Sequence, residues 1–137
     1  MHAEGIREMS LHPNHFSGEA IGAAIEVHRA LGPGLLESAY QRCLARELAI
    51  RGIPFRKELW IGIDYKGIQI HRAYRLDFLI GRLVAVEIKA VNSLTPIDDA
   101  QLLTYLKLGG WPVGLLINFN VPVLKDGIHR RVLNLVG

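Results

Sequence analysis

The hydrophobic pattern in the N-terminal part of the chain predicts two consecutive helices. Apolar positions recur at helical spacing in residues 17–31 and 35–52, and the Gly-Pro-Gly run at 32–34 separates the two segments. Ser17 is the expected N-cap of the first helix. The apolar stripes expected to face the core are Ile21, Ala24, Ile25, His28 and Leu31 on the first helix, and Leu36, Tyr40, Leu44 and Leu48 on the second.

After Pro54 the pattern changes to alternation, which predicts strands. Lys66 and Gly67 suit a tight turn between the first two strands, and Trp60 or Ile61 starts the inward-facing set of the first strand. The segments expected from here on are strands at 55–65, 68–80 and 83–91, a helix at 95–110, a strand at 113–119 and a short strand within 129–136.

The helix at 95–110 has the clearest boundary signals. Thr95 can cap it, Pro96 fits its first position, and Asp98 stands where the acid of a capping box belongs. Gly109 and Gly110 end it. The resulting order is α-α-β-β-β-α-β, with β once more at the end, and it predicts an α/β or α+β fold in which helices pack on a sheet.

Composition fits one domain without covalent or metal support. The chain has 137 residues, half of them hydrophobic, and a formal net charge of +3, which permits a polyanionic partner without demanding one. We expect a loose arm at residues 1–15 and a single domain at 16–137. Cys43 is the one cysteine, so an internal disulfide is excluded. With no long apolar run and no signal-peptide pattern, a cytoplasmic protein without a membrane segment is expected.

Residues 74–90 hold charges inside two apolar strands. Side chains alternate along a strand, so the two apolar faces cover one core only in one register. The pairs expected in that register are Leu76–Ile88, Phe78–Val86 and Ile80–Val84, joined by a three-residue loop at 81–83. The same register sets Asp77 directly opposite Glu87, with Lys89 one strand step away.

Two opposed carboxylates repel each other unless something compensates their charge. Water could screen them on an exposed face, Lys89 and Arg75 could neutralise them, or a divalent cation could bridge them, since Mg²⁺ is usually held by one or two carboxylates plus waters. Taken alone, the three charges Asp77, Glu87 and Lys89 are explained at least as well by a solvated hairpin face.

Three further groups of polar residues allow a functional and a structural interpretation. Gln101 and Tyr105 share a helix face and could order a water or a phosphate, or could be surface residues. Glu37 and Tyr40 also share a face, although an acid in a first turn commonly serves the helix dipole. His28 lies on an apolar stripe, where a histidine is more often a core residue than a ligand.

The stretch "EVHRALGPGLLESAYQ" resembles the signature of the GxxExxY family, with the motif on Gly34, Glu37 and Tyr40. The similarity continues through "YRLDFLI", "AVEIKAV", "AQLLTYLKLGG", "GLLINF" and "LKDGIHRRV" and covers most of the chain. That family resembles a RecB-like branch of the PD-(D/E)XK nuclease superfamily. The resemblance implies a restriction-endonuclease-like mixed sheet flanked by helices, with the site on its central hairpin.

The resemblance also implies roles for individual residues. Asp77 and Glu87 would bind Mg²⁺ or Mn²⁺, with Glu37 and the backbone carbonyl of Ile88 as further ligands, and Lys89 would complete the catalytic set. Positions that would bind substrate or support the site are Gln101, Tyr105, Tyr40 and His28. Leu76 stands where the superfamily name has proline.

The expected function is therefore metal-dependent hydrolysis of nucleic acid, with DNA favoured over RNA and Arg72, Arg75 and Lys107 attracting the backbone. The alternatives are a catalytically silent nuclease fold that binds nucleic acid or protein, and an interaction protein whose charge cluster is a salt bridge. A homodimer is compatible with a domain of this size.

Overall fold

Five strands form one mixed sheet in the order β1-β2-β3-β4-β5 in a computed structural model of the chain, which describes residues 12–133. The strands are β1 (Phe55–Tyr65), β2 (Ile68–Ile80), β3 (Val84–Lys89), β4 (Val113–Asn118) and β5 (Ile128–Val132). Neighbouring strands are antiparallel except β3 and β4, which are parallel. A parallel pair needs a long crossover connection, and helix α4 (Pro96–Gly109) lies in that connection.

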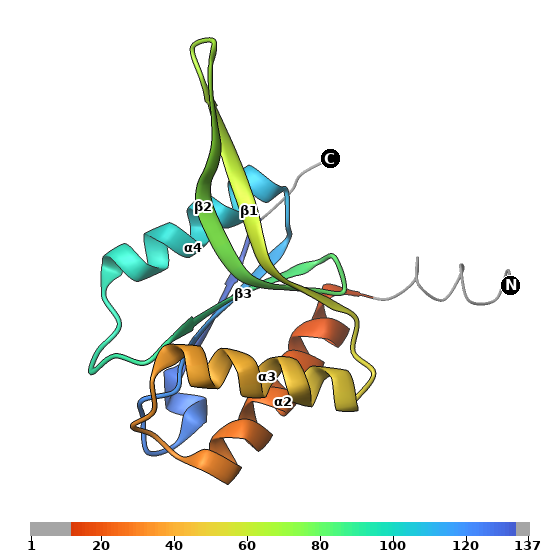
Figure 1. Cartoon of the computed structure of the whole chain (residues 1–137), viewed down its shortest axis with the longest axis vertical. Helices are drawn as coiled ribbons and strands as arrows, with labels where there is room; N and C mark the ends of the chain where they lie inside the picture. Colours follow the sequence, from red (N-terminus) through yellow and green to blue (C-terminus); the bar gives the residue numbers. More distant parts are fainter. Residues whose placement is uncertain (1–11, 134–137) are drawn as a thin grey trace, which may run out of the picture.

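Helices cover both faces of the sheet (Figure 1). Helices α2 (Pro13–Leu31) and α3 (Glu37–Ile50) pack on one face, where they share a large apolar core with β2, β3 and β4. Helix α4 packs on the other face over a smaller core that includes Leu76, Leu79 and Ala85. The predicted order of elements and the restriction-endonuclease-like fold class are confirmed, with a short 3-10 helix, η1 (Leu124–Gly127), before β5.

The start of α2 differs from the prediction. The helix begins at Pro13, and the ring of His12 accepts a hydrogen bond from the Asn14 N–H at 3.1 Å, so His12 rather than Ser17 is the N-cap. Ser17 lies inside the helix, where its hydroxyl donates to the Asn14 carbonyl at 3.2 Å. Residues 13–15 of the predicted arm are thus helical, and the rest of that arm, up to residue 11, lies outside the described residues.

The buried face of α2 is also rotated from the predicted stripe. Ile25 and Leu31 are exposed, while Ala24 and His28 are buried as expected. The other buried positions of the helix are Phe16, Ser17, Ala20, Ala23 and Val27. Small alanine side chains let the helix axis come close to its neighbours, so burial here follows close approach rather than side-chain hydrophobicity.

Leu36 is the one member of the α3 stripe that the structure contradicts. Tyr40, Leu44 and Leu48 are fully buried, but Leu36 is 78% exposed. Leu36 is the N-cap residue and has extended backbone, so its side chain does not continue the helical stripe.

The predicted turns and caps of the other elements are confirmed. Lys66 and Gly67 form the β1–β2 turn with φ values of 45° and 88°, which suits a two-residue hairpin loop. Thr95 and Asp98 form the capping box of α4. In β1 the inward side chain is Ile61, whereas Trp60 is 47% exposed. Within residues 12–133, no helix has the length and apolar character needed to cross a membrane.

Candidate functional site

The β2–β3 hairpin has the predicted register over its first three pairs only. Ile80 pairs with Val84, Leu79 with Ala85 and Phe78 with Val86 around the three-residue loop, and the ladder then stops. Beyond Phe78 the expected pair of Leu76 with Ile88 is absent from the ladder, although Leu76 still pairs with Leu59 of β1 on the other side. The strands separate where the two acids stand.

The carboxylates of Asp77 and Glu87 accept hydrogen bonds from backbone N–H groups where the β2–β3 ladder has stopped. The Asp77 N–H donates to Glu87 Oε1 at 3.0 Å, and the Ile88 N–H donates to Asp77 Oδ2 at 2.8 Å. Buried N–H groups need acceptors, and here the carboxylates of the opposite strand supply them. The two acids therefore converge between the strands, and they are 6% and 8% exposed, so a solvated hairpin face is ruled out.

The separation of the strands also corrects the predicted alternation of β2. Leu76 belongs to the core under α4 together with Leu79, while Phe78 belongs to the core under α2 and α3. Across from Asp77, Glu58 of β1 has a φ of 56°, which L-residues seldom adopt in a strand. Simple alternation fails at this step because both strands flanking Asp77 are irregular there.

Burial raises the pKa of both acids above its usual range. For Glu87 the loss of solvation and the charge of Asp77 raise the pKa from 4.5 to about 8. Loss of solvation also raises the pKa of Asp77, although the Ile88 N–H, Glu87, Arg75 and Lys89 act against the shift. The pair resists carrying two negative charges, so a cation between the strands would be favoured.

A pH dependence of stability follows for the metal-free protein. Because the folded pKa of Glu87 lies above its unfolded value of 4.5, the folded state holds the proton more tightly. The resulting stabilisation is complete below pH 4.5 and is lost as the pH rises through about 8. We expect the free energy of unfolding to fall across this window by up to about 1.4 kcal/mol per pH unit. Urea denaturation in a chelating buffer at several pH values measures it; a stability that rises through the window would contradict the raised pKa.

Helix α3 brings two polar side chains toward the acids. Gln41 Nε2 donates to Asp77 Oδ1 at 2.5 Å. Glu37 lies one helical turn earlier and is exposed, and partial loss of solvation raises its pKa, with Asp77 and Asp98 adding to the shift and Lys89 opposing it. The predicted site residue Glu37 is thus within electrostatic range of Asp77. Gln41 was not predicted, although its spacing of four residues from Glu37 placed both on one helix face.

Lys89 points toward the start of α4. Its Nζ lies 3.8 Å from Asp98 Oδ1, and the side chains of the two residues are 21% and 20% exposed. Asp98 Oδ2 accepts from the Thr95 N–H at 2.9 Å, so the acid that caps the helix also holds the lysine near the site. This second task of Asp98 could not be inferred from its capping-box position.

Tyr105 of α4 approaches the acids from the opposite side. Burial raises the pKa of its phenol, and the charges of Glu87 and Asp77 raise it further. The ring is 3% exposed and packs edge-on against Tyr74, with the ring centres 5.5 Å apart. Gln101 lies half-buried one turn earlier on the same helix.

Tyr40 and His28 serve the packing of the helices. The Tyr40 hydroxyl donates to the Gly32 carbonyl at 2.6 Å and accepts from the Leu35 N–H at 3.1 Å, while its ring stacks on Phe119. One ring nitrogen of His28 lies 2.8 Å from the carbonyl oxygen of Val121. The contacts of both side chains among the described residues fasten α2 and α3 to the core rather than reaching Asp77 or Glu87.

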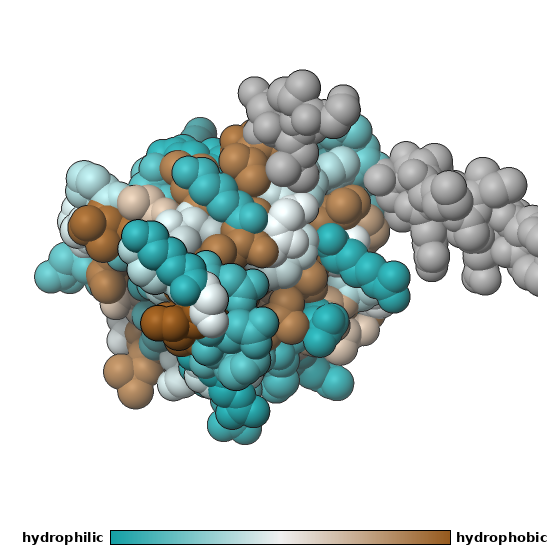
Figure 2. Space-filling view, turned by 90° about the horizontal axis from the view of Figure 1, so that it is seen from above, coloured by the Kyte–Doolittle hydropathy of each residue, from teal (hydrophilic) through white to brown (hydrophobic). Residues whose placement is uncertain are grey.

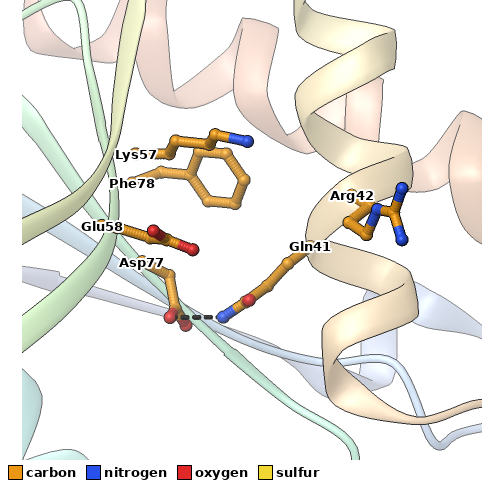
Figure 3. A pocket seen from close by; sticks show the side chains of 6 residues that line it. All are labelled: Gln41, Arg42, Lys57, Glu58, Asp77 and Phe78. Carbon is orange, nitrogen blue, oxygen red and sulfur yellow. Dashed lines mark hydrogen bonds between the residues drawn. The ribbon is translucent and has the colours of Figure 1, made fainter.

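A small cavity opens beside Asp77 on the α3 side of the sheet (Figure 3). Gln41 reaches into it from α3, and Lys57 and Glu58 approach it from β1. Its volume of about 30 Å³ exceeds the roughly 10–15 Å³ that one water needs. The space therefore admits a water or an ion next to the carboxylate, but not a nucleotide.

The donor set fits a magnesium-type ion held largely by water. Within residues 12–133, no group of three or more His, Cys, Asp or Glu side chains is close enough to hold a metal ion, so Glu37 does not join Asp77 and Glu87 in one ligand cluster. Two carboxylates are nevertheless a usual protein contribution for Mg²⁺, which keeps several waters. Their raised pKa values mark an excess of buried negative charge that such an ion would neutralise.

Comparison with protein families matches residues 14–131 to the model described as the PD-(D/E)XK nuclease superfamily. Neither the comparison with curated proteins nor the comparison with solved structures finds a match. The matched region contains the whole sheet apart from the last residue of β5, nearly all of the three helices and the converging acids. The chain belongs to the PD-(D/E)XK nuclease superfamily.

Proposed function

We propose that this protein is a nuclease that uses Mg²⁺ or Mn²⁺ to hydrolyse phosphodiester bonds, with DNA as the preferred substrate. The observation that supports it best is the pair of hydrogen bonds from the Asp77 N–H to Glu87 and from the Ile88 N–H to Asp77, which fixes two buried carboxylates side by side between β2 and β3. Membership of the superfamily supports the reaction class. A bound Mg²⁺ or Mn²⁺ would lower the pKa of a coordinated water and polarise a phosphoryl oxygen.

In this proposal Asp77 and Glu87 hold the ion, and the carbonyl of Ile88 is a further ligand. Glu37 supports the ion through water, since it lies within electrostatic range but outside a shared ligand cluster. Gln41 keeps Asp77 in place by its hydrogen bond.

Lys89 orients the attacking water and offsets negative charge as the phosphate reacts. Its ion pair with Asp98 supports this role, because it keeps the ammonium group at the edge of the site. Gln101 and Tyr105 position the phosphate or its waters. Tyr40 and His28 act indirectly by holding the helices that carry Glu37 and Gln41. Membership of the GxxExxY branch, a cytoplasmic location and a homodimer belong to the same proposal.

An assay with labelled single- and double-stranded DNA and RNA tests the function. We expect cleavage in Mg²⁺ or Mn²⁺ and none in a chelator, with DNA cleaved faster than RNA. The matched control is Glu87→Gln rather than Glu87→Ala, because glutamine keeps an oxygen that can accept from the Asp77 N–H. Retention of nucleic acid by folded protein without turnover in either metal would favour the catalytically silent binding module instead.

A further inference from the structure

Strands β1 and β2 continue past the body of the protein as a two-stranded ribbon that ends at the Lys66-Gly67 turn (Figure 1). From Arg72 outward β2 is exposed on both faces, up to its first residue, Ile68. The large apolar side chains exposed on the ribbon are Trp60, Tyr65, Ile68 and Ile70. Seen from above, hydrophilic and hydrophobic side chains are interspersed on this side of the molecule (Figure 2).

A bulge in the ribbon gathers two arginines on one tryptophan. The pairing passes from Ile61–Tyr74 directly to Ile63–Ile70, so β2 has extra residues here, and Arg72 among them has a φ of 57°. Such backbone is strained for a residue with a side chain and tends to occur where function requires it. The Arg72 guanidinium lies over the Trp60 ring, 5.4 Å from its centre. Arg75, the cross-strand partner of Trp60, lies 5.9 Å from the same centre.

None of the ion pairs within residues 12–133 includes Arg72 or Arg75. The part of the hairpin from residue 60 to 75 contains the basic residues Lys66, Arg72 and Arg75 and the acidic residue Asp64, a net charge of +2. The ribbon is therefore net positive, and the tryptophan orders two cations whose N–H donors stay available.

We propose that the β1–β2 ribbon is a binding arm for duplex DNA, in which Arg72 and Arg75, ordered by Trp60, contact backbone phosphates. This inference takes only the class of ligand, DNA, from the proposed function. A two-stranded β-ribbon fits the major groove of B-DNA, about 12 Å wide. From Ile68 to Arg75 the ribbon spans about 20 Å, or about six base pairs. The positive charge of Arg75 also opposes the rise in the pKa of Asp77, so the arm begins beside the candidate site.

The charge of the ribbon favours a nucleic acid over a protein partner. An apolar protein contact would use Tyr65, Ile68 and Ile70 but would leave two guanidinium groups to be desolvated without acids. Phosphates satisfy both groups, and Trp60 keeps their planes ordered in advance.

Binding of a labelled duplex of about 20 base pairs, measured by fluorescence anisotropy in a chelating buffer at several salt concentrations, tests the arm separately from catalysis. At about 0.1 M salt, the double variant Arg72→Ala/Arg75→Ala should bind roughly tenfold more weakly for each guanidinium group that it removes from a phosphate. Its slope of log K against log salt should be smaller by about 1.8. The control Arg46→Ala/Lys125→Ala removes two exposed cations elsewhere and should keep the wild-type slope.

Trp60 supplies a second signal. The chain has two tryptophans, so Trp111→Phe leaves Trp60 as the only one, and we expect its fluorescence, excited selectively over that of the four tyrosines, to change on titration with duplex. The proposal would be overturned if the arm and control variants bound duplex equally weakly, or if Trp60 emission did not change. It would also be overturned if the arm variant lost self-association instead of DNA binding. So would binding confined to single strands. An arm that behaves as expected in a protein that never cleaves would instead count against the nuclease proposal alone.

Discussion

Replacing Lys89 with alanine is expected to lower metal-dependent cleavage by about a hundredfold or more, because the ammonium group would no longer orient the attacking water or offset charge on the reacting phosphate. Lys89 is only partly buried, and its ion pair with Asp98 at 3.8 Å is long and partly solvated, so folding should be little affected. Initial rates of oligonucleotide cleavage, with thermal unfolding of the same samples, measure both effects.

The matched control is Lys125→Ala, which removes an exposed lysine from η1 and should leave the cleavage rate close to that of the wild type. Asp98→Asn offers a graded comparison, since the asparagine oxygen can still accept from the Thr95 N–H but the side chain no longer attracts Lys89 by charge. We expect its rate to fall between those of the wild type and Lys89→Ala. A Lys89→Ala protein that cleaves at the wild-type rate would remove this residue from the mechanism.

Glu87→Gln is expected to abolish cleavage while stabilising the metal-free protein at alkaline pH. Glutamine keeps an oxygen for the Asp77 N–H but takes away one of the two buried negative charges. Above pH 8 the wild type must ionise Glu87 beside Asp77, whereas the variant need not. The gain should reach a few kcal/mol, at about 1.4 kcal/mol for each unit by which folding raises the pKa.

Denaturation curves of both proteins at pH 6 and pH 9, with and without Mn²⁺, separate the effect of Glu87 on stability from its effect on metal binding. Mn²⁺ should stabilise the wild type, more at the higher pH, and should have little effect on the variant. The comparison substitution is Glu47→Gln on α3, which removes an acid that pairs with Arg51 outside the site. A variant that is less stable than the wild type at pH 9 in chelator would contradict the raised pKa of Glu87.

The fold was predictable from the sequence wherever local signals agreed with the tertiary structure. The order of elements and the capping box of α4 follow from hydrophobic period and turn chemistry, and both are present. The hairpin register followed from matching apolar faces, and its first three pairs are as expected. Asp77 and Glu87 could be brought together from the sequence because this register is fixed by residues within a few positions of them.

The details that depend on other segments could not be predicted. The alternation rule treats Leu76 and Phe78 as neighbours on one face, but the carboxylates inserted between β2 and β3 place them in different cores. Gln41 comes to Asp77 from 36 positions away, by the packing of α3 on the sheet. Tyr40 looked like a site residue because it lies one turn from Glu37, whereas its hydrogen bonds to Gly32 and Leu35 belong to the connection between the helices.

The parallel pairing of β3 with β4 separates the site into parts that should form at different times during folding. Asp77 and Glu87 are ten positions apart on one hairpin, so closing the loop between them costs little chain entropy. Val84 meets Val113 only after the crossover through α4, and long-range pairing of this kind is slow. The acids should therefore meet early, and Lys89, whose strand neighbour is Asn118, should reach its final place late in folding.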